Sequence, residues 1–409
     1  MKRPIRRSIR RPDAESAPRP AAPAAMTVAG IMSGTSADGI DTAIVRIAPR
    51  AGDLALQFLG HAGVRFPRAL RQAVLRAMNA DSIAVSELAR LNWRLGQAYA
   101  EALASAVEEI PCRLDLVGCH GQTIYHQPKA ELYAGRRVAC TWQIGEMAPL
   151  AARAGVPVVS NFRPADMVAG GQGAPLVPLL DFVLYRSETR GRVLQNLGGI
   201  GNLTALAPGA PASQALAFDT GPANMVIDQL MQRLYGKEFD RGGAAARAGR
   251  VLDSVVNEAL RERFFHRTPP KSAGREQFGP EFAGRFLSAC RKAGGGDADA
   301  VATATALTAA SVRHAYRSFV RERMGAAPVD FIVSGGGARN RTLLAMLRDL
   351  LEPEGCRVQL SDGLGLPIEA KEAAAFALLA YQTWHRRPGN LPAATGAARP
   401  AILGEIHYA

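Results

Sequence analysis

Three glycine-rich segments carry the groups best suited to bind phosphate. They are GIMSGTSADGID (30–41), GGIGN (198–202) and SGGGARN (334–340). Small residues let phosphate oxygens approach backbone N–H groups, and hydroxyls such as Ser33, Thr35 and Ser36 can add hydrogen bonds, although no GK[ST] Walker ending follows. A plain hairpin turn is the alternative for the first segment. Two such turns facing each other would hold a polyphosphate from both sides.

Two carboxylates beside the first segment indicate a cation. Asp38 and Asp41 would repel phosphate unless Mg2+ lay between them and the phosphates, directly or through water. The sequence does not assign the metal ligands beyond this pair.

Asp219 is the candidate general base. It lies in AFDTGPANM (217–225), where an apolar strand is predicted to end before a turn and a helix that Pro222 opens. A carboxylate at the end of a strand can point into a cleft and accept a proton. The alternative is that Asp219 caps the following helix, a common role for Asp.

Two further segments carry candidate substrate-binding side chains. NFRPADMVAGGQGAPL (161–176) is predicted to be an exposed loop that presents Arg163, Asp166 and Gln172, and Arg163 could hold a carboxylate with two hydrogen bonds. CHGQTIYH (119–126) offers His120 and His126, whose spacing does not resemble a metal pair. Substrate or structural hydrogen bonding is the interpretation for both histidines.

The elements that position these residues follow one repeated plan. Strands are predicted at 27–32, 40–47 and 54–66, with helices at 68–78 and 83–109 and a short strand at 115–119. A second set of strands is predicted at 193–197, 203–207, 215–218 and 331–335. Further helices are expected at 246–264, 280–292 and 301–323, from about Asn340, and at 367–386. Two units that each begin with strand, glycine turn and strand predict a duplicated α/β domain with a cleft between the copies.

Length and composition fit a soluble two-domain protein. The chain has 409 residues, 48% of them hydrophobic and 21% charged, and no apolar run approaches the roughly 20 residues of a membrane-spanning helix. We expect domains at 26–160 and 161–390, a C-terminal segment at 391–409, and no membrane partner.

The net charge of +13 is concentrated at the start of the chain. Residues 1–25 carry seven Lys or Arg and no periodic apolar face, so we expect a disordered tail, with Met26 as an alternative start. No apolar segment of a signal peptide follows, and a nucleic-acid or membrane-surface tail is the less favoured alternative. Five widely spaced cysteines without a CxxC pair argue against disulfides and zinc, and they fit a cytoplasmic protein.

Eleven strings together resemble the anhydro-N-acetylmuramic acid kinase family, in both order and wording, from about residue 30 to 406. They are GIMSGTSADGID, CHGQTIYHQP, TWQIGE, NFRPAD, GGQGAPL, NLGGIGN, FDTGPAN, PPKSAGRE, SGGGARN, EAKEAAAFA and PGNLPAATGA. The resemblance implies two duplicated actin/hexokinase-like (ribonuclease H-like) domains around an ATP cleft. It also implies ATP-dependent opening of the 1,6-anhydro ring of the sugar with phosphorylation of O6, in the recycling of peptidoglycan.

The resemblance also implies roles for individual residues. Asp219 would be the base that takes a proton from water. The residues implied for ATP, with Mg2+, are Ser33, Gly34, Thr35, Ser36, Ala37, Asp38, Gly39, Ile40, Gly198, Gly199, Asn202, Gly335, Gly336, Gly337 and Asn340. The residues implied for the sugar are His120, Arg163, Asp166, Gln172 and Glu372. The expected partner is the small-molecule sugar, without nucleic acid, and a homodimer is left open.

The chain departs from the family pattern at a few places. These are the basic tail, Ala273 where Thr is expected, and Lys371 beside Glu372. Two alternatives stay open. One is a kinase of the same fold acting on an ordinary sugar hydroxyl, and the other is an ATP-binding module that responds to a protein partner without catalysis.

Overall fold

The computed structural model describes residues 24–34, 36–50, 53–78, 80–361, 365–367 and 369–409. The expected disordered tail therefore lies outside the described residues, apart from Ala24 and Ala25, and so does Thr35. In the described ranges, no helix is long and apolar enough to cross a membrane. The five cysteines are all free, as the sequence predicted.

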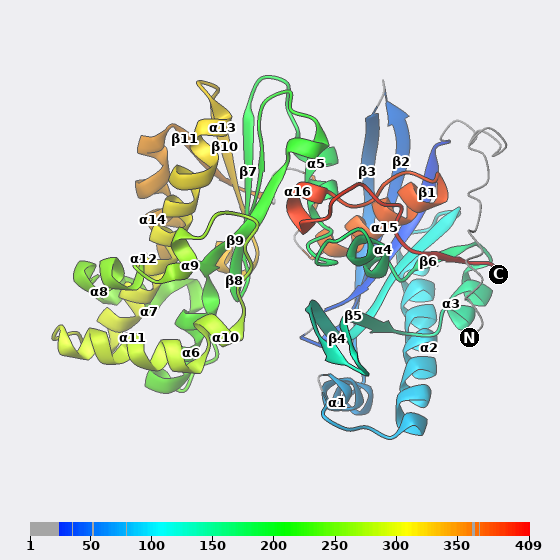
Figure 1. Ribbon diagram of the computed structural model, residues 1–409, viewed down its shortest axis with the longest axis horizontal. Coiled ribbons are helices and arrows are strands. Elements are labelled where there is room, and N and C mark those ends of the chain that lie inside the picture. Colours follow the sequence, from blue (N-terminus) through cyan, green and yellow to red (C-terminus); the bar gives the residue numbers. More distant parts are fainter. Residues whose placement is uncertain (1–23, 35, 51–52, 79, 362–364, 368) are drawn as a thin grey trace, which may run out of the picture.

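Two β-sheets form the frame of the molecule, side by side in Figure 1. Among the described residues, the first has the order β12-β6-β4-β1-β2-β3, with β5 attached to β4, and the second has the order β11-β10-β7-β8-β9. The strands are β1 Met26–Ser33, β2 Gly39–Arg50, β3 Asp53–Arg65, β4 Leu116–Tyr133, β5 Arg136–Ile144, β6 Val158–Ser160, β7 Gly191–Leu197, β8 Ile200–Leu206, β9 Leu216–Pro222, β10 Val329–Ser334, β11 Cys356–Leu360 and β12 Glu405–His407.

The two sheets repeat one topology. In the first, β1, β2 and β3 are antiparallel neighbours in sequence order, β4 pairs with β1 in parallel, and β6 pairs with β4 in parallel. In the second, β7, β8 and β9 are arranged in the same way, β10 pairs with β7 in parallel and β11 with β10 in parallel. The first two glycine turns therefore occupy equivalent places, between the first two strands of each sheet. The prediction of a duplicated α/β fold is confirmed.

Helices cover the faces of both sheets. They are α1 Arg68–Ala77, α2 Val85–Glu109, α3 Met147–Ala154, α4 Arg163–Val168, α5 Pro178–Tyr185, α6 Asn224–Tyr235, α7 Ala244–Ala248, α8 Asp253–Ala259, α9 Arg263–His266, α10 Arg275–Phe278, α11 Pro280–Lys292, α12 Asp297–Ala315, α13 Arg321–Met324, α14 Arg341–Leu351, α15 Lys371–Trp384 and α16 Pro392–Thr395. α2 packs on one face of the first sheet, and α12 and α14 pack on one face of the second.

Helix α15 lies on the other face of the first sheet, although it follows the second sheet in sequence (Figure 1). Glycines on the strands allow its close approach. A Cβ on Gly30 would lie 1.8 Å from the Ala373 carbonyl oxygen, and a Cβ on Gly118 would lie 2.3 Å from that of Phe376. The alanines of α15 present small side chains at this contact, so the pair of surfaces can exclude water without voids. The N-terminus of α15 is thereby fixed beside the cleft.

The expected domain boundaries do not coincide with the sheets. Residues 161–390 were expected to form one domain, but α5 and α15 share an apolar cluster with strands β1 and β2 of the first sheet. The C-terminal segment also returns to the first sheet, where β12 pairs antiparallel with β6. Sequence order alone suggested one continuous second domain, whereas packing of the apolar face of α15 brings the end of the chain back.

Several expected elements differ in extent. The short strand predicted at 115–119 is the start of β4, which continues into a hairpin with β5 across a turn at Ala134 and Gly135, both with positive φ. The helix predicted at 246–264 is three short helices, α7, α8 and α9, because Gly249 is extended and packs directly against the backbone of α12. The helix predicted at 301–323 begins earlier, at Asp297, and widens into a π-turn at residues 316–320.

Candidate active site

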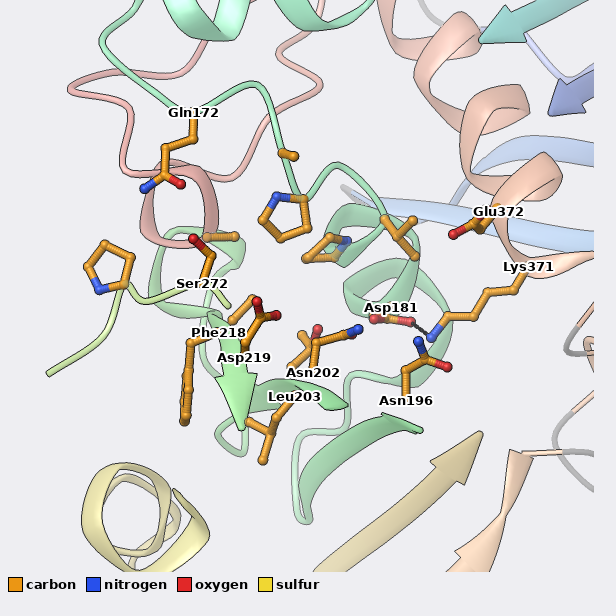
Figure 2. A pocket seen from close by; sticks show the side chains of 18 of the residues that line it. Gln172, Asp181, Asn196, Asn202, Leu203, Phe218, Asp219, Ser272, Lys371 and Glu372 are labelled. Atoms are coloured by element: carbon orange, nitrogen blue, oxygen red, sulfur yellow. Dashed lines mark ion pairs between the residues drawn. The ribbon is translucent and has the colours of Figure 1, made fainter. Parts of the chain in front are cut away.

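A cavity of about 610 Å³ lies between the two sheets and takes residues from both (Figure 2). Its polar lining is Asp41, His126, Gln172, Asp181, Asn196, Asn202, Thr204, Asp219, Lys271, Ser272, Ser334, Glu369, Lys371 and Glu372. Residues from opposite ends of the sequence therefore meet at one place, where a ligand could contact both halves of the molecule.

Asp219 lies in β9, opposite Asn202 of β8, and its side chain is directed into the cavity (Figure 2). Its Oδ2 accepts a hydrogen bond from the backbone N–H of Ala273 at 2.8 Å, and its own N–H donates to the carbonyl oxygen of Lys271 at 3.0 Å. Within the described part of the chain, no hydrogen bond reaches Oδ1. One carboxylate oxygen is therefore fixed while the other can accept a proton.

The environment of Asp219 suits a base that works near neutral pH. Burial raises the pKa of Asp219 from 3.8 to about 6, and Glu276 adds to the rise. The Ala273 N–H and the charge of Lys271 oppose it. A carboxylate with such a pKa is ionised at pH 7 yet is a stronger base than an exposed one.

The helix-capping alternative for Asp219 is wrong. Strand β9 continues to Pro222, and α6 begins only at Asn224, so Pro222 ends a strand rather than opening a helix. Ala223 is the N-cap residue of α6, and no side chain caps it. The carboxylate of Asp219 is bonded instead to a segment more than 50 residues away.

Few side chains of the first glycine turn are exposed among its described residues. Ser33 is 1% exposed and its hydroxyl bonds to that of Tyr99 at 2.9 Å, while Ala37 and Ile40 are buried in the apolar core. Ser36 and Asp38 are exposed. A Cβ on Gly39 would lie 2.3 Å from the Val64 carbonyl oxygen, so this residue has to be Gly. Any ligand of this turn would meet N–H groups and Ser36 rather than the Ser33 hydroxyl.

The other two glycine turns lie on the second sheet. The Gly198 and Gly199 carbonyls accept hydrogen bonds from the first N–H groups of α6, and Asn202 is exposed to the cavity. Gly335 has φ +84°, and a Cβ there would lie 2.5 Å from Asn196 Oδ1. Asn340 caps α14, its Oδ1 accepting from Leu343 N at 3.0 Å.

A second hollow of about 720 Å³ adjoins the third turn. Gly336 and Asn340 line it together with Asn224 and Asp228 of α6, and its remaining lining includes arginines of α7, α14 and the segments before them. Burial raises the pKa of Asp228 to about 6. Asn, Asp and Arg side chains therefore border this hollow, which lies on the second sheet's side of the cleft.

The five residues predicted for the sugar fall into two groups. Gln172 and Glu372 line the cavity, and burial raises the pKa of Glu372, with Arg163 and Lys371 opposing and Asp41 adding to the rise. His120, Arg163 and Asp166 do not line it.

Arg163 and His120 form a linked pair behind the cavity wall. Arg163 donates from Nε to His120 Nε2 at 3.0 Å and from Nη1 to the Gly173 carbonyl at 2.7 Å. His120 Nδ1 bonds to the Gly121 carbonyl at 2.8 Å, which makes Nδ1 the donor. Burial and the Arg163 charge hold the pKa of His120 well below its usual range, so the ring is neutral.

Asp166 is 0% exposed and lies in α4, not in an exposed loop as predicted. Oδ2 accepts from Gly173 N at 2.8 Å, and Oδ1 accepts from Asn390 Nδ2 and Thr395 Oγ1, each at 2.7 Å. The carboxylate thus joins three separate segments of the chain around the loop that carries Gln172.

Comparison with known proteins places the chain in a family. The sequence model of the anhydro-N-acetylmuramic acid kinase family matches residues 26–409. The chain belongs to this family. The anhydro-N-acetylmuramic acid kinase of Bacillus cereus strain Q1 is 42% identical over 386 residues, covering 94% of this chain and 99% of that protein. The corresponding protein of Bacillus anthracis strain CDC 684 is 41% identical over the same length. The chain is therefore a kinase, which transfers a phosphoryl group.

Solved structures give weaker likenesses. A glucokinase of the ROK family from Streptomyces griseus, in complex with glucose and AMPPNP, has a TM-score of 0.37 at 14% identity, over 87% of this chain and 99% of that one. The activator of 2-hydroxyisocaproyl-CoA dehydratase from Clostridium difficile, with bound ADPNP, has a TM-score of 0.40 at 11% identity, over 88% of this chain and 96% of that one.

Several polar residues of the kinase cavity had no individual role in the sequence analysis, among them Lys271, Lys371, Asp181 and Asn196. Lys271 belongs to the string PPKSAGRE, which was recognised without a function, and Lys371 was seen only as a departure from the family pattern. Lys371 Nζ lies 2.7 Å from Asp181 Oδ1, and Asn196 faces the same part of the cavity (Figure 2). Asp181 lies in ordinary helix sequence, and Asn196 begins the string NLGGIGN, in which only the glycines and Asn202 were given a role.

Proposed function

We propose that this kinase uses ATP to phosphorylate O6 of 1,6-anhydro-N-acetylmuramic acid while water opens the anhydro ring, giving N-acetylmuramic acid 6-phosphate. The observation that carries the proposal is the position of Asp219. Its carboxylate faces a cavity lined from both sheets, with one oxygen fixed and the other without a partner among the described residues. The substrate is taken from the name of the family and of its relatives.

In the proposed reaction, Asp219 takes a proton from a water molecule as the water oxygen bonds to C1 of the sugar. The C1–O6 bond breaks, and O6 attacks the γ-phosphorus of ATP. The bond from that phosphorus to the bridging oxygen breaks, so ADP leaves. The proton on Asp219 then returns to solvent. One carboxylate thus serves both bond changes, and its pKa of about 6 makes it ionised at neutral pH.

We assign the triphosphate to the two glycine turns that begin the sheets. The N–H groups of the described residues of the first turn and the exposed Asn202 would contact it from opposite sides. The adenosine would occupy the hollow beside Gly336 and Asn340, where the flat glycine backbone allows a close approach.

The carboxylates present fit Mg2+. Asp41 lies at the cavity edge, and its Oδ1 accepts from His61 Nε2 at 2.9 Å, which leaves Oδ2 for a cation or its water. No group of three or more His, Cys, Asp or Glu in the described ranges could hold a metal ion by itself. Mg2+ usually takes one or two protein carboxylates and completes its shell with water and phosphate, and when bound it neutralises charge on the phosphates.

We assign Gln172 and Glu372 to direct contact with the sugar, since both line the cavity. We assign His120, Arg163 and Asp166 to holding the loop that presents Gln172. We also propose that the protein is cytoplasmic, where ATP is available, and forms a homodimer. Exposed apolar side chains on the β4–β5 hairpin, such as Leu132, Tyr133 and Trp142, could contribute to the contact between copies, which light scattering would measure.

The decisive assay supplies ATP, Mg2+ and the anhydro sugar in 18O-labelled water and weighs the product. We expect the sugar to gain one water and one phosphoryl group, with the label on the C1 hydroxyl. Label in the phosphate would contradict the proposal, because it would report ATP hydrolysis instead. Glucose and N-acetylglucosamine are the controls, and equal turnover of either would favour the ordinary sugar kinase.

A further inference from the structure

A buried lysine lies next to the proposed base. Lys271 is 4% exposed, and its Nζ donates to the carbonyl oxygens of Phe265 at 2.9 Å and Phe264 at 3.2 Å. The ammonium also lies 4.7 Å from the ring centroid of Phe319 and 4.8 Å from that of Phe264. Aromatic faces and carbonyls stabilise a cation that has lost its water, so the protein has built a specific site for this charge.

The backbone of the same segment holds Asp219 on two sides. The Lys271 carbonyl accepts the N–H of Asp219 at 3.0 Å, and two residues later the Ala273 N–H donates to Oδ2 at 2.8 Å. The side chain of Lys271 ties this segment to α9 through the carbonyls of Phe264 and Phe265. Movement of the lysine would therefore move both backbone groups that orient the carboxylate.

Lys271 also lines the cavity, and a lysine ammonium has three donors, of which two are used by carbonyls. Burying a charge lowers the free energy of unfolding, and an apolar side chain could fill an aromatic cage without this loss. A buried ammonium in the segment whose backbone holds the Asp219 carboxylate thus points to an electrostatic task.

We propose that Lys271 is a positioning residue for Asp219: it anchors the segment that clamps the carboxylate and supplies the positive charge that keeps the carboxylate ionised in a buried setting. The inference rests on the proposed role of Asp219 as the base, and it deepens that role. It explains how one carboxylate can be removed from solvent and still be ready to accept a proton.

Several other charged groups surround this pair. Glu276 raises the pKa of Asp219, and Lys271 lowers it. Burial and Arg267 lower the pKa of Lys271 to about 8, and Lys271 in turn contributes to a lowered pKa of His314. Charged residues on the cavity lining away from this segment are Asp41, Asp181, Glu369, Lys371 and Glu372. They are left unchanged in the experiment.

The test compares the pH dependence of kcat/KM for the full-length enzyme and for Lys271→Gln and Lys271→Arg. The Gln variant can still donate to the carbonyls of Phe264 and Phe265 but lacks the charge, whereas the Arg variant keeps the charge. We expect the acid limb of Lys271→Gln to move upward, by up to about one pH unit, because the positive charge of Lys271 lowers the pKa of Asp219. The limb of Lys271→Arg should stay close to that of the wild type.

Phe319→Leu is the matched control, since it removes one ring of the cage but keeps the ammonium. It should lower the melting temperature without moving the acid limb. Lys271→Gln could instead lower the melting temperature and leave the acid limb of the kcat/KM profile where it is in the wild type. Lys271 would then have a structural role only, and the inference would be overturned. Failure of the proposed base is seen separately, as near-normal turnover of Asp219→Asn.

Discussion

Two aspartates show how the same side chain is used in two regions of this molecule. Asp219, between β9 and the segment 271–273, has one hydrogen-bonded oxygen and faces the cavity. Asp166, in α4, is 0% exposed and accepts three hydrogen bonds, one from the nearby Gly173 N–H and two from Asn390 and Thr395 near the end of the chain. Burial alone therefore does not separate a carboxylate with an oxygen free for a ligand from one that the protein itself satisfies. The number of satisfied oxygens does.

The physical difference between the two carboxylates lies in how many groups of the protein stabilise each of them. Three donors bond to the two carboxylate oxygens of Asp166, so these hydrogen bonds hold the loop in place. One backbone donor and Lys271 compensate Asp219 only in part, and its pKa is raised to about 6. The same substitution, Asp to Asn, should consequently have opposite effects at the two positions.

The largest expected effect is on turnover of Asp219→Asn. The amide is nearly isosteric but cannot accept a proton, and loss of a general base typically lowers the rate by about 10^2 to 10^4. A base that serves two coupled bond changes should lie at the upper end of this range. Ring opening and phosphorylation should fall together, while ATP affinity, measured by calorimetry, stays unchanged.

Near-normal turnover of this variant would contradict the assignment of Asp219 as the base, and with it the contrast between the two aspartates. Glu372 would then be the carboxylate to examine, since it lines the cavity. Asp166 would be a poor replacement, because all its contacts are to the protein itself.

The next largest effect is expected on the stability of Asp166→Asn. An amide group must place an NH2 against at least one of the donors from Gly173, Asn390 and Thr395, which leaves buried donors unpaired. We expect a loss of roughly 2 to 4 kcal/mol in the free energy of unfolding. Turnover well below the melting temperature should fall much less than in Asp219→Asn, and the reverse order would refute the assignment.

A third prediction concerns the pH dependence of stability for Asp219→Asn. The folded-state pKa of Asp219 is above its value of 3.8 in an unfolded chain, so ionisation destabilises the fold as the pH rises through about 6. A shift from 3.8 to about 6 corresponds to about 3 kcal/mol, at about 1.36 kcal/mol per unit. The variant should be more stable than the wild type at pH 8, by up to this amount.

Below about pH 4 the advantage should disappear, because the wild-type carboxyl is then protonated in both states. Chemical unfolding at pH 4 and pH 8 measures the difference. Equal stabilities of the wild type and Asp219→Asn at pH 8 would show that the protein stabilises the charge of Asp219 more than its contacts indicate. The contrast with Asp166 would then be weaker.

The smallest expected effect comes from removing one partner of Asp166. Thr395→Val deletes the hydroxyl that donates to Oδ1 but leaves Asn390 and Gly173 in place, so we expect a loss of about 1 to 2 kcal/mol. Thr305→Val is the control, since its hydroxyl donates only to the Val301 carbonyl within the same helix. The melting temperature should fall more for Thr395→Val than for the control. Equal decreases would show that the hydrogen bond from Thr395 to Asp166 contributes little to stability.

The two aspartates also mark the limit of sequence reasoning. Both were recognised as candidates, because both lie in recognisable strings, FDTGPAN and NFRPAD. Two of the three partners that satisfy Asp166 lie 224 and 229 residues away, in PGNLPAATGA, a string recognised without a role. The local sequence identifies a carboxylate, but it does not predict whether donors far away in the chain form hydrogen bonds to its oxygens.

The sequence by itself determined the repeated plan of strand, glycine turn and strand, the start of α14 at its Asn cap, and the family, since these depend on short-range patterns of side chains and on backbone groups. The tertiary structure alone decided that α15 and the C-terminal strand return to the first sheet, that Lys271 lies in an aromatic cage, and that the carboxylate of Asp219 faces the cavity while that of Asp166 does not. The reason is that hydrogen-bond satisfaction and burial of a charge depend on segments hundreds of residues apart, whose approach is set by packing of apolar faces rather than by any local pattern.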